Sequence, residues 1–287
     1  MMTPLKRNAL ILMTLASLAL PLAGCAGTAP EQTESGPQGL IQPGFLTTCT
    51  YPEYHPMEYF EGGTGGEIVG FDVDLARAVG DSWGVQTKVV NTAFDGLIPG
   101  LDAQRCDLVI SGLSVSDARR EVADAVPYML TGYDFGVQSG EKSLENPEDY
   151  SGRTVAVLAG SRMVAKLKTV NEQLASEGKP LIKIDEYPGT PLAAGAVISG
   201  KADAVIDTDI AIASLVSKSN GTLEAVTSAF KPDEVFGAYL RKDGTLTGAF
   251  KDALKELQEK GTLAALADRY GLDPNKIDLS SNLSSKQ

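Results

Sequence analysis

Two successive series of alternating strands and helices constrain the fold of this chain more than any other feature. The first series has predicted strands at residues 45–50, 86–91 and 108–110, with helices at residues 72–83 and 95–105. The second has strands at residues 155–158, 181–187 and 204–206, with helices at residues 161–177, 191–199 and 210–217. Such alternation predicts parallel sheets with helices on both faces. Two similar series predict an α/β protein with two Rossmann-like lobes of comparable size.

Two short extended segments that combine glycine with aromatic residues flank the second series. They are residues 132–137 and 236–240. We expect these segments to pair with each other as strands that carry the chain between the lobes. The second crossing would return the chain to the first lobe, so helices predicted at residues 246–260 and 263–270 should pack there.

The stretch from Cys106 to Arg120 is the first candidate for a functional site. The short apolar run Leu108–Ile110 predicts a buried strand, and a loop of serines and a glycine follows it. Ser116 is a favourable helix N-cap, and Arg119 lies in the first turn of that helix. Hydroxyls, helix-start amides and a guanidinium suit a carboxylate or phosphate. The alternative is an ordinary strand-to-helix turn with solvated arginines.

Composition argues against several classes of function. The formal net charge of −12 argues against a nucleic-acid partner, because no basic patch stands out from the acidic background. One histidine and three cysteines leave little material for a zinc site or a histidine-based catalytic triad. We therefore predict no metal and no cofactor.

The N-terminus predicts export. Lys6 and Arg7 precede an apolar run, Ala9–Leu22, which suits the core of a signal peptide in residues 1–24. The run ends in Leu-Ala-Gly-Cys, which resembles a bacterial lipobox and implies cleavage before Cys25 and lipidation of its sulfur. A plain secretory signal is the alternative. Residues 25–44 then form the lipidated cysteine and a flexible tether rich in polar residues, glycine and proline.

Lipidation of Cys25 would leave an even pair, Cys49 and Cys106. Both lie in or next to predicted neighbouring strands. In an oxidising compartment an even pair predicts a disulfide, and two buried free thiols are the alternative.

Several segments, in this order, resemble the family 3 extracellular solute-binding proteins, the amino-acid-binding components of bacterial ABC importers. They are residues 54–58 (Tyr-His-Pro-Met-Glu), 69–76 (Val-Gly-Phe-Asp-Val-Asp-Leu-Ala), 94–99 (Phe-Asp-Gly-Leu-Ile-Pro), 106–119 and 261–263 (Gly-Thr-Leu). The resemblance implies the periplasmic binding protein type 2 fold, in which two α/β lobes are joined by a two-strand hinge. It implies lobe 1 at residues 45–133 and 237–272, lobe 2 at residues 134–236, and a polar tail at residues 273–287.

The resemblance also implies ligand-binding roles in the first lobe. Arg119 matches the arginine that binds the ligand α-carboxylate, whereas Arg120 has no such match. Tyr54 and Phe94 match aromatic walls around the ligand side chain, with core packing as the alternative. Three further positions match groups that face the ligand carboxylate and ammonium: Ser111, Gly112 and Ser114.

In the second lobe, Ser161 and Arg162 match a turn whose amides face the ligand carboxylate, and Asp207 matches the aspartate that pairs with the ammonium.

Three departures from the family pattern bear on specificity. Tyr51 stands where many relatives have an acidic residue, which argues against a lysine or arginine ligand. Arg162 stands where the family usually has threonine. One expectation is that it binds a second carboxylate of an acidic ligand, and the alternative is that it points outward. Asp207 matches the family's aspartate only if the preceding strand is one residue shorter than in the family. If it is not, Thr208 occupies that position, and Asp209 is a further alternative.

The function that the resemblance implies is that of a monomeric, extracytoplasmic lipoprotein, anchored to the membrane through Cys25 and without enzymatic activity. It would bind a small amino acid and deliver it to the permease of an ABC importer. Two alternatives remain. One is a dehydratase-type enzyme on the same fold, with Glu58 as the candidate proton carrier. The other is a ligand sensor that acts through a separate membrane receptor.

Overall fold

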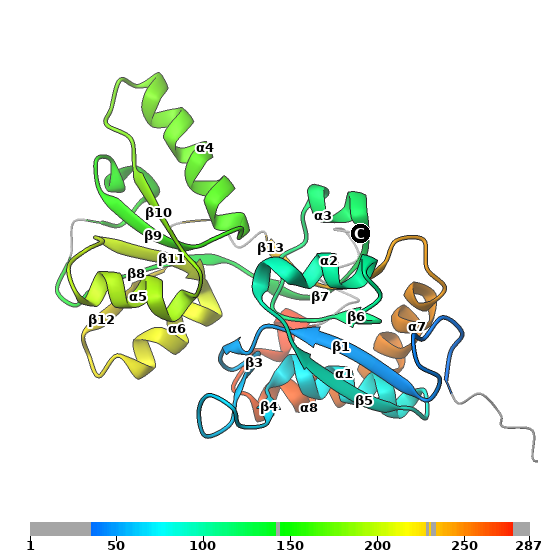
Figure 1. Ribbon diagram of the computed structural model, residues 1–287. Helices are drawn as coiled ribbons and strands as arrows, with labels where there is room; N and C mark the ends of the chain where they lie inside the picture. The colour runs from blue at the N-terminus through cyan, green and yellow to red at the C-terminus, as the bar shows by residue number, and fades with distance from the viewer. Residues whose placement is uncertain (1–35, 142–143, 228–229, 231–233, 278–287) are drawn as a thin grey trace, which may run out of the picture. The chain divides into compact units, whose positions relative to one another are not determined.

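The computed structural model describes residues 36–141, 144–227, 230 and 234–277 (Figure 1). The predicted signal peptide, Cys25, most of the predicted tether and the end of the polar tail lie outside these residues. No helix in the described ranges is long and apolar enough to cross a membrane.

The first lobe is built on a five-stranded sheet in the order β5-β1-β6-β13-β7. Its strands are β1 (Phe45–Thr50), β5 (Gln86–Asn91), β6 (Leu108–Val109), β7 (Ala123–Thr131) and β13 (Glu234–Arg241). β1 runs parallel to β5 and β6, as the alternation predicts, but β13 runs antiparallel to β6 and β7. The sheet is therefore mixed, because the strand that returns from the second lobe enters it in the opposite direction.

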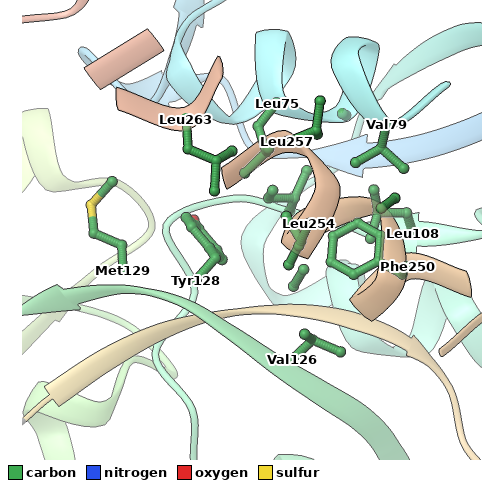
Figure 2. Packing of buried hydrophobic residues seen from close by; sticks show 14 of the residues in the cluster. Leu75, Val79, Leu108, Val126, Tyr128, Met129, Phe250, Leu254, Leu257 and Leu263 are labelled. Carbon is green, nitrogen blue, oxygen red and sulfur yellow. The ribbon is translucent and has the colours of Figure 1, made fainter. Parts of the chain in front are cut away.

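Helices cover the first sheet on both faces. They are α1 (Phe71–Ser82), α2 (Leu97–Asp102), α3 (Asp117–Val122), α7 (Leu246–Glu259) and α8 (Thr262–Arg269), with 3₁₀ turns η1 (Phe94–Gly96) and η3 (Pro274–Ile277). Figure 2 shows Phe250, Leu254 and Leu263 of the last two helices packed with Leu75 of α1 and with Tyr128 of β7. The prediction that the C-terminal helices pack on the first lobe is therefore confirmed.

A small sheet of three short strands, β2 (Glu53–Tyr54), β3 (Glu58–Phe60) and β4 (Ile68–Val69), lies before α1. β3 and β4 pair antiparallel, and the hairpin turn between them contains the glycine-rich residues 62–66 (Gly-Gly-Thr-Gly-Gly). β2 places Glu53 and Tyr54 beside β3.

The second lobe has a sheet in the order β10-β9-β11-β8-β12. Its elements are β8 (Tyr133–Gln138), η2 (Pro147–Tyr150), β9 (Thr154–Leu158), α4 (Arg162–Ser176), β10 (Lys183–Tyr187), α5 (Thr190–Ile198), β11 (Ala204–Thr208), α6 (Asp209–Lys218) and β12 (Leu223–Val226). β9 runs parallel to β10 and β11, while β8 runs antiparallel to β11 and β12.

The predicted pairing between residues 132–137 and 236–240 is wrong. β13 pairs with β7, with Glu234 opposite Thr131, and the segment after Gly132 instead belongs to the second sheet as β8. The sequence analysis did not predict β7. Its Pro127 argues against a strand, and the structure accommodates this residue where the register shifts between Phe236 and Gly237.

The structure joins Cys49 of β1 and Cys106 by a disulfide, with their Cα atoms 5.7 Å apart. β1 and β6 are adjacent parallel strands, so the two cysteines lie on neighbouring segments of one sheet. Both are buried in an apolar cluster with Leu97 and Leu101.

The segments next to the outer ends of the described chain are bound to the first lobe. Ile41 donates its backbone N–H to Asp107, and Arg241 donates to the carbonyl of Gly39. At the other end, Ile277 of η3 is buried in the main core.

Candidate functional site

All nine ligand-binding residues named from the sequence line one pocket, to which both lobes contribute. The first lobe and the small sheet provide Tyr51, Glu53, Tyr54, Glu58, Phe94, Ser111, Gly112, Leu113, Ser114 and Arg119, and the second lobe provides Leu158, Ser161, Arg162, Met163, Thr190, Asp207 and Thr208. The pocket lies where β6, β9 and β11 end and helices begin, as expected for ligand sites in α/β sheets.

Arg119 is fixed by the loop that precedes its helix. Ser116 caps α3 by accepting a hydrogen bond from the backbone N–H of Arg119 at 3.3 Å. The Arg119 guanidinium donates to the carbonyl of Ser114 at 2.7 Å, and the Tyr239 hydroxyl donates to the same carbonyl at 2.7 Å. Burial lowers the pKa of Arg119, but an arginine remains charged under all ordinary conditions. The pocket therefore contains a preorganised cation.

Two buried carboxyl groups, those of Glu58 and Asp72, accept hydrogen bonds from the loop that follows β6. Ser111 donates its hydroxyl to Glu58 at 2.9 Å, while the Gly112 N–H and the Tyr128 hydroxyl donate to Asp72 at 2.6 Å and 2.8 Å. Burial raises the pKa of both carboxyls, of Asp72 to about 7, and for Glu58 the neighbouring Asp72 adds to the effect. The Ser111 hydroxyl and the Gly112 N–H thus bind protein carboxyls, and their contribution to the site is to hold the loop in shape.

Gly112 also determines where the aromatic wall lies. Its φ of +47° is left-handed, and a Cβ there would lie 2.5 Å from Cε1 of Tyr54. A side chain at this position would displace the tyrosine ring. The Tyr54 hydroxyl bonds the Thr208 hydroxyl of the second lobe. On the other side, Phe94 contacts the Tyr51 ring edge-to-face and has the Arg119 guanidinium 5.8 Å from its centroid.

The second lobe contributes a carboxylate and an unpaired hydroxyl. Asp207 is 4% exposed and accepts hydrogen bonds from the Thr190 hydroxyl and the Thr208 N–H, both at 2.7 Å. Burial raises its pKa to about 6. Ser161 is the N-cap residue of α4, but its buried hydroxyl makes no capping hydrogen bond and has no hydrogen-bond partner within the described residues. A buried hydroxyl without a partner is unfavourable, so it is suited to bind a ligand.

Of the three alternative positions for the ammonium partner, the structure places two at the pocket and gives the third other partners. Asp207 and Thr208 both line the pocket. Asp209 instead accepts hydrogen bonds from Thr131 at 2.8 Å and Lys276 at 2.6 Å. Arg162 lines the pocket, but its guanidinium binds the carbonyl of Val115 and the carboxylate of Glu234.

Glu53 and Thr190 also line the pocket, although neither was predicted from the sequence. Glu53 accepts a hydrogen bond from the Tyr51 hydroxyl at 2.6 Å, and that hydroxyl also lies 3.1 Å from the carbonyl of Pro188 in the second lobe. Glu53 directly precedes Tyr54 in the sequence, and this position is the signal from which its role at the pocket could have been predicted. Thr190 is brought to Asp207 only by the fold. In the described ranges, no group of three or more metal-binding side chains was found.

Two mixed α/β lobes that both contribute polar groups to one pocket define a class, the binding proteins of the periplasmic type 2 fold. A family model described as "Bacterial extracellular solute-binding proteins, family 3" matches residues 46–273, so the chain belongs to this family.

Similar proteins support the assignment. The chain is 30% identical over 263 residues to the "Arginine-binding extracellular protein ArtP" of Bacillus subtilis (strain 168), covering 91% of this chain and 96% of that protein. It is 29% identical over 230 residues to the "L-cystine-binding protein TcyJ" of Escherichia coli (strain K12), covering 79% and 82%. The solved structure "An ancestral arginine-binding protein bound to arginine" has a TM-score of 0.72 and 27% identity, covering 79% and 98%. These relatives are named as binding proteins rather than enzymes.

Proposed function

We propose that this chain is an extracytoplasmic lipoprotein that binds an amino acid between its lobes and delivers it to an ABC permease. The observation that carries the proposal is that one pocket contains two groups of opposite charge, the half-buried Arg119 from the first lobe and the buried Asp207 from the second. A zwitterion needs one partner of each sign, and such pairing is favourable when both partners are already held in place.

In the proposed complex, Arg119 binds the ligand α-carboxylate, since a guanidinium matches a carboxylate with two parallel hydrogen bonds. Ser161, at the start of α4, supplies a hydroxyl and a positive helix end to the same group. Asp207 binds the ammonium, because its two oxygens have acceptor capacity beyond the bonds from Thr190 and Thr208. Tyr54 and Phe94 enclose the ligand side chain.

The negative charge of Glu53, which lines the pocket beside Tyr54, favours a ligand with a cationic side chain. Tyr51 takes the place of the acidic residue found in many relatives, but Glu53 lies 2.6 Å from its hydroxyl and lines the pocket. An acid is thus present despite the substitution at Tyr51. The names of the arginine-binding relatives agree with this charge. We propose L-arginine or a similar cationic amino acid.

Replacing Glu53 with glutamine is expected to weaken L-arginine binding by about three- to tenfold, while L-glutamine binding changes less than twofold. The loss is moderate because Glu53 is exposed and water screens its charge. Titration calorimetry against a panel of amino acids measures both effects. Glu61→Gln, at the exposed hairpin tip, is the matched control. An equal loss for both ligands would contradict the specificity role, and binding of no amino acid would overturn the proposed function.

Acidification should weaken binding because only ionised Asp207 pairs with the ligand ammonium. Its pKa of about 6 means that the carboxylate is nearly fully ionised at pH 7.5 and mostly protonated at pH 5. We therefore expect affinity to fall about tenfold between these values. Asp207→Asn should bind weakly at both pH values and show a flatter profile. A wild-type affinity that is constant across this range would refute the role of Asp207.

The lipid anchor is a separate element of the proposal. Its support is the Leu-Ala-Gly-Cys sequence at Cys25 behind an apolar run, together with membership in an extracellular family. In bacterial cells, wild type should incorporate labelled fatty acid and sediment with membranes, whereas Cys25→Ser should do neither. Fatty-acid incorporation that persists in Cys25→Ser would contradict the anchor site. We further propose binding without turnover, so ligand recovered after incubation should be chemically unchanged.

A further inference from the structure

Arg162, the first residue of α4 in the second lobe, connects to the first lobe through both ends of its guanidinium. Nη1 donates to the carbonyl of Val115, in the loop between β6 and α3. Nη2 lies 3.2 Å from Oε1 of Glu234, the first residue of β13. A residue that the sequence suggested for a second ligand carboxylate is therefore already bound to the protein.

Both partners of Arg162 are held in fixed positions. Val115 donates its N–H to the carbonyl of Val235 at 2.9 Å, and Glu234 pairs with Thr131 at the point where β7 leaves the first sheet. Glu234 has only 6% of its surface exposed. A carboxylate buried to this degree needs a cation, because removal of the partner leaves an uncompensated charge. Among the residues that the structure describes, Arg162 forms an ion pair with Glu234.

The position of Arg162 also affects the ligand site. It lies close enough to Arg119 for its charge to add to the burial that lowers the pKa of Arg119. Two adjacent guanidiniums repel each other, and Glu234 compensates the second of them. Arg119 is thereby left as the cation directed at a ligand carboxylate.

We propose that Arg162 is an interlobe latch: by binding Val115 and Glu234 it stabilises the arrangement in which the lobes enclose the pocket, and it slows ligand release. Arg162 is in this view a positioning residue. The effect on ligand release rests on the proposed function, whereas the effect on lobe arrangement does not.

The arrangement of the lobes can be measured without ligand. Spin labels at Asp102→Cys and Glu172→Cys, both exposed and on different lobes, report the interlobe distance by pulsed electron resonance in the mature chain with Cys25→Ser. Arg162→Gln and Glu234→Gln should each shift the distribution to longer distances. Arg153→Gln is the matched control, since its partner Asp203, 3.1 Å away, lies in the same lobe. Distributions of both variants that superimpose on wild type would overturn the latch, whether or not any ligand is found.

Dissociation of L-arginine, followed by stopped-flow fluorescence, provides the second readout. Each latch variant should release ligand about tenfold faster, as for loss of one charge-assisted hydrogen bond. The double variant should release it no faster than the more affected single variant, because both substitutions remove the same contact. Additive effects, or faster release in Arg153→Gln as well, would contradict the latch. Arg162→Lys should restore part of the slow release, since it retains the charge but not the fork.

Discussion

Alanine in place of Arg119 is expected to weaken amino-acid binding by about 100-fold or more. The half-buried Arg119 side chain lines the pocket and its guanidinium is the proposed partner of the ligand α-carboxylate. Removal of one member of a buried charge pair costs about 2–5 kcal/mol, because the other charge is then desolvated without a partner. Titration calorimetry at low salt, with the ligand in large excess where needed, measures the loss.

The neighbouring arginine provides the control for this substitution. Arg120 lies on the same short helix and does not line the pocket, so Arg120→Ala should change affinity less than twofold. Arg119→Lys should fall between wild type and Arg119→Ala, because an ammonium retains the charge and loses the two-pronged geometry. Equal affinities for Arg119→Ala and wild type would show that the carboxylate is bound elsewhere.

Removal of the disulfide is the change expected to affect stability most. The bond closes a loop with a sequence separation of 57 between Cys49 and Cys106. Closure of a loop of this size restricts the unfolded chain, and its loss should lower the free energy of unfolding by about 4 kcal/mol. Alanine is the suitable replacement at both positions, since the surrounding cluster is apolar. Guanidinium unfolding of Cys49→Ala/Cys106→Ala against wild type measures the difference.

Reduction separates the disulfide from the packing of the sulfur atoms. A reductant should destabilise wild type and leave the double alanine variant unchanged. Thiol titration of the denatured protein carrying Cys25→Ser should find no free thiol. Two free thiols, or a wild type that is insensitive to reductant, would support the alternative of buried reduced cysteines.

Alternation of strands and helices was enough to predict both lobes, and its failures have identifiable causes. Pro127 removes a backbone donor, which argues against a strand at β7, but β7 lies at the edge of its sheet and its register with β13 shifts beside this residue, and proline is tolerated in both situations. Because β7 was not predicted, residues 236–240 were paired with residues 132–137 instead of with β7, and that prediction was wrong. The antiparallel strands β8 and β13 are buried along nearly their whole length, like parallel strands, so their direction could not be read from periodicity.

The structure agrees with the sequence at one feature of the pocket that depends on local sequence. Ser116 caps the helix of Arg119 as its position suggested. Roles that depend on contacts across the fold were not accessible. The Ser111 hydroxyl binds Glu58, the Ser161 hydroxyl does not cap its helix, and Arg162 reaches Glu234 from more than seventy positions away in the chain. Hydrogen-bond partners of this kind depend on which distant segments the fold brings together, which local residue spacing does not encode.

A crystal structure of the mature chain with its bound amino acid tests the central claim most directly. The account predicts that the ligand α-carboxylate lies within hydrogen-bonding distance of the Arg119 guanidinium. It also predicts that the ammonium contacts Asp207, and that a cationic side chain passes between Tyr54 and Phe94 toward Glu53. A ligand bound outside this pocket, or one that places its carboxylate away from Arg119, would contradict it.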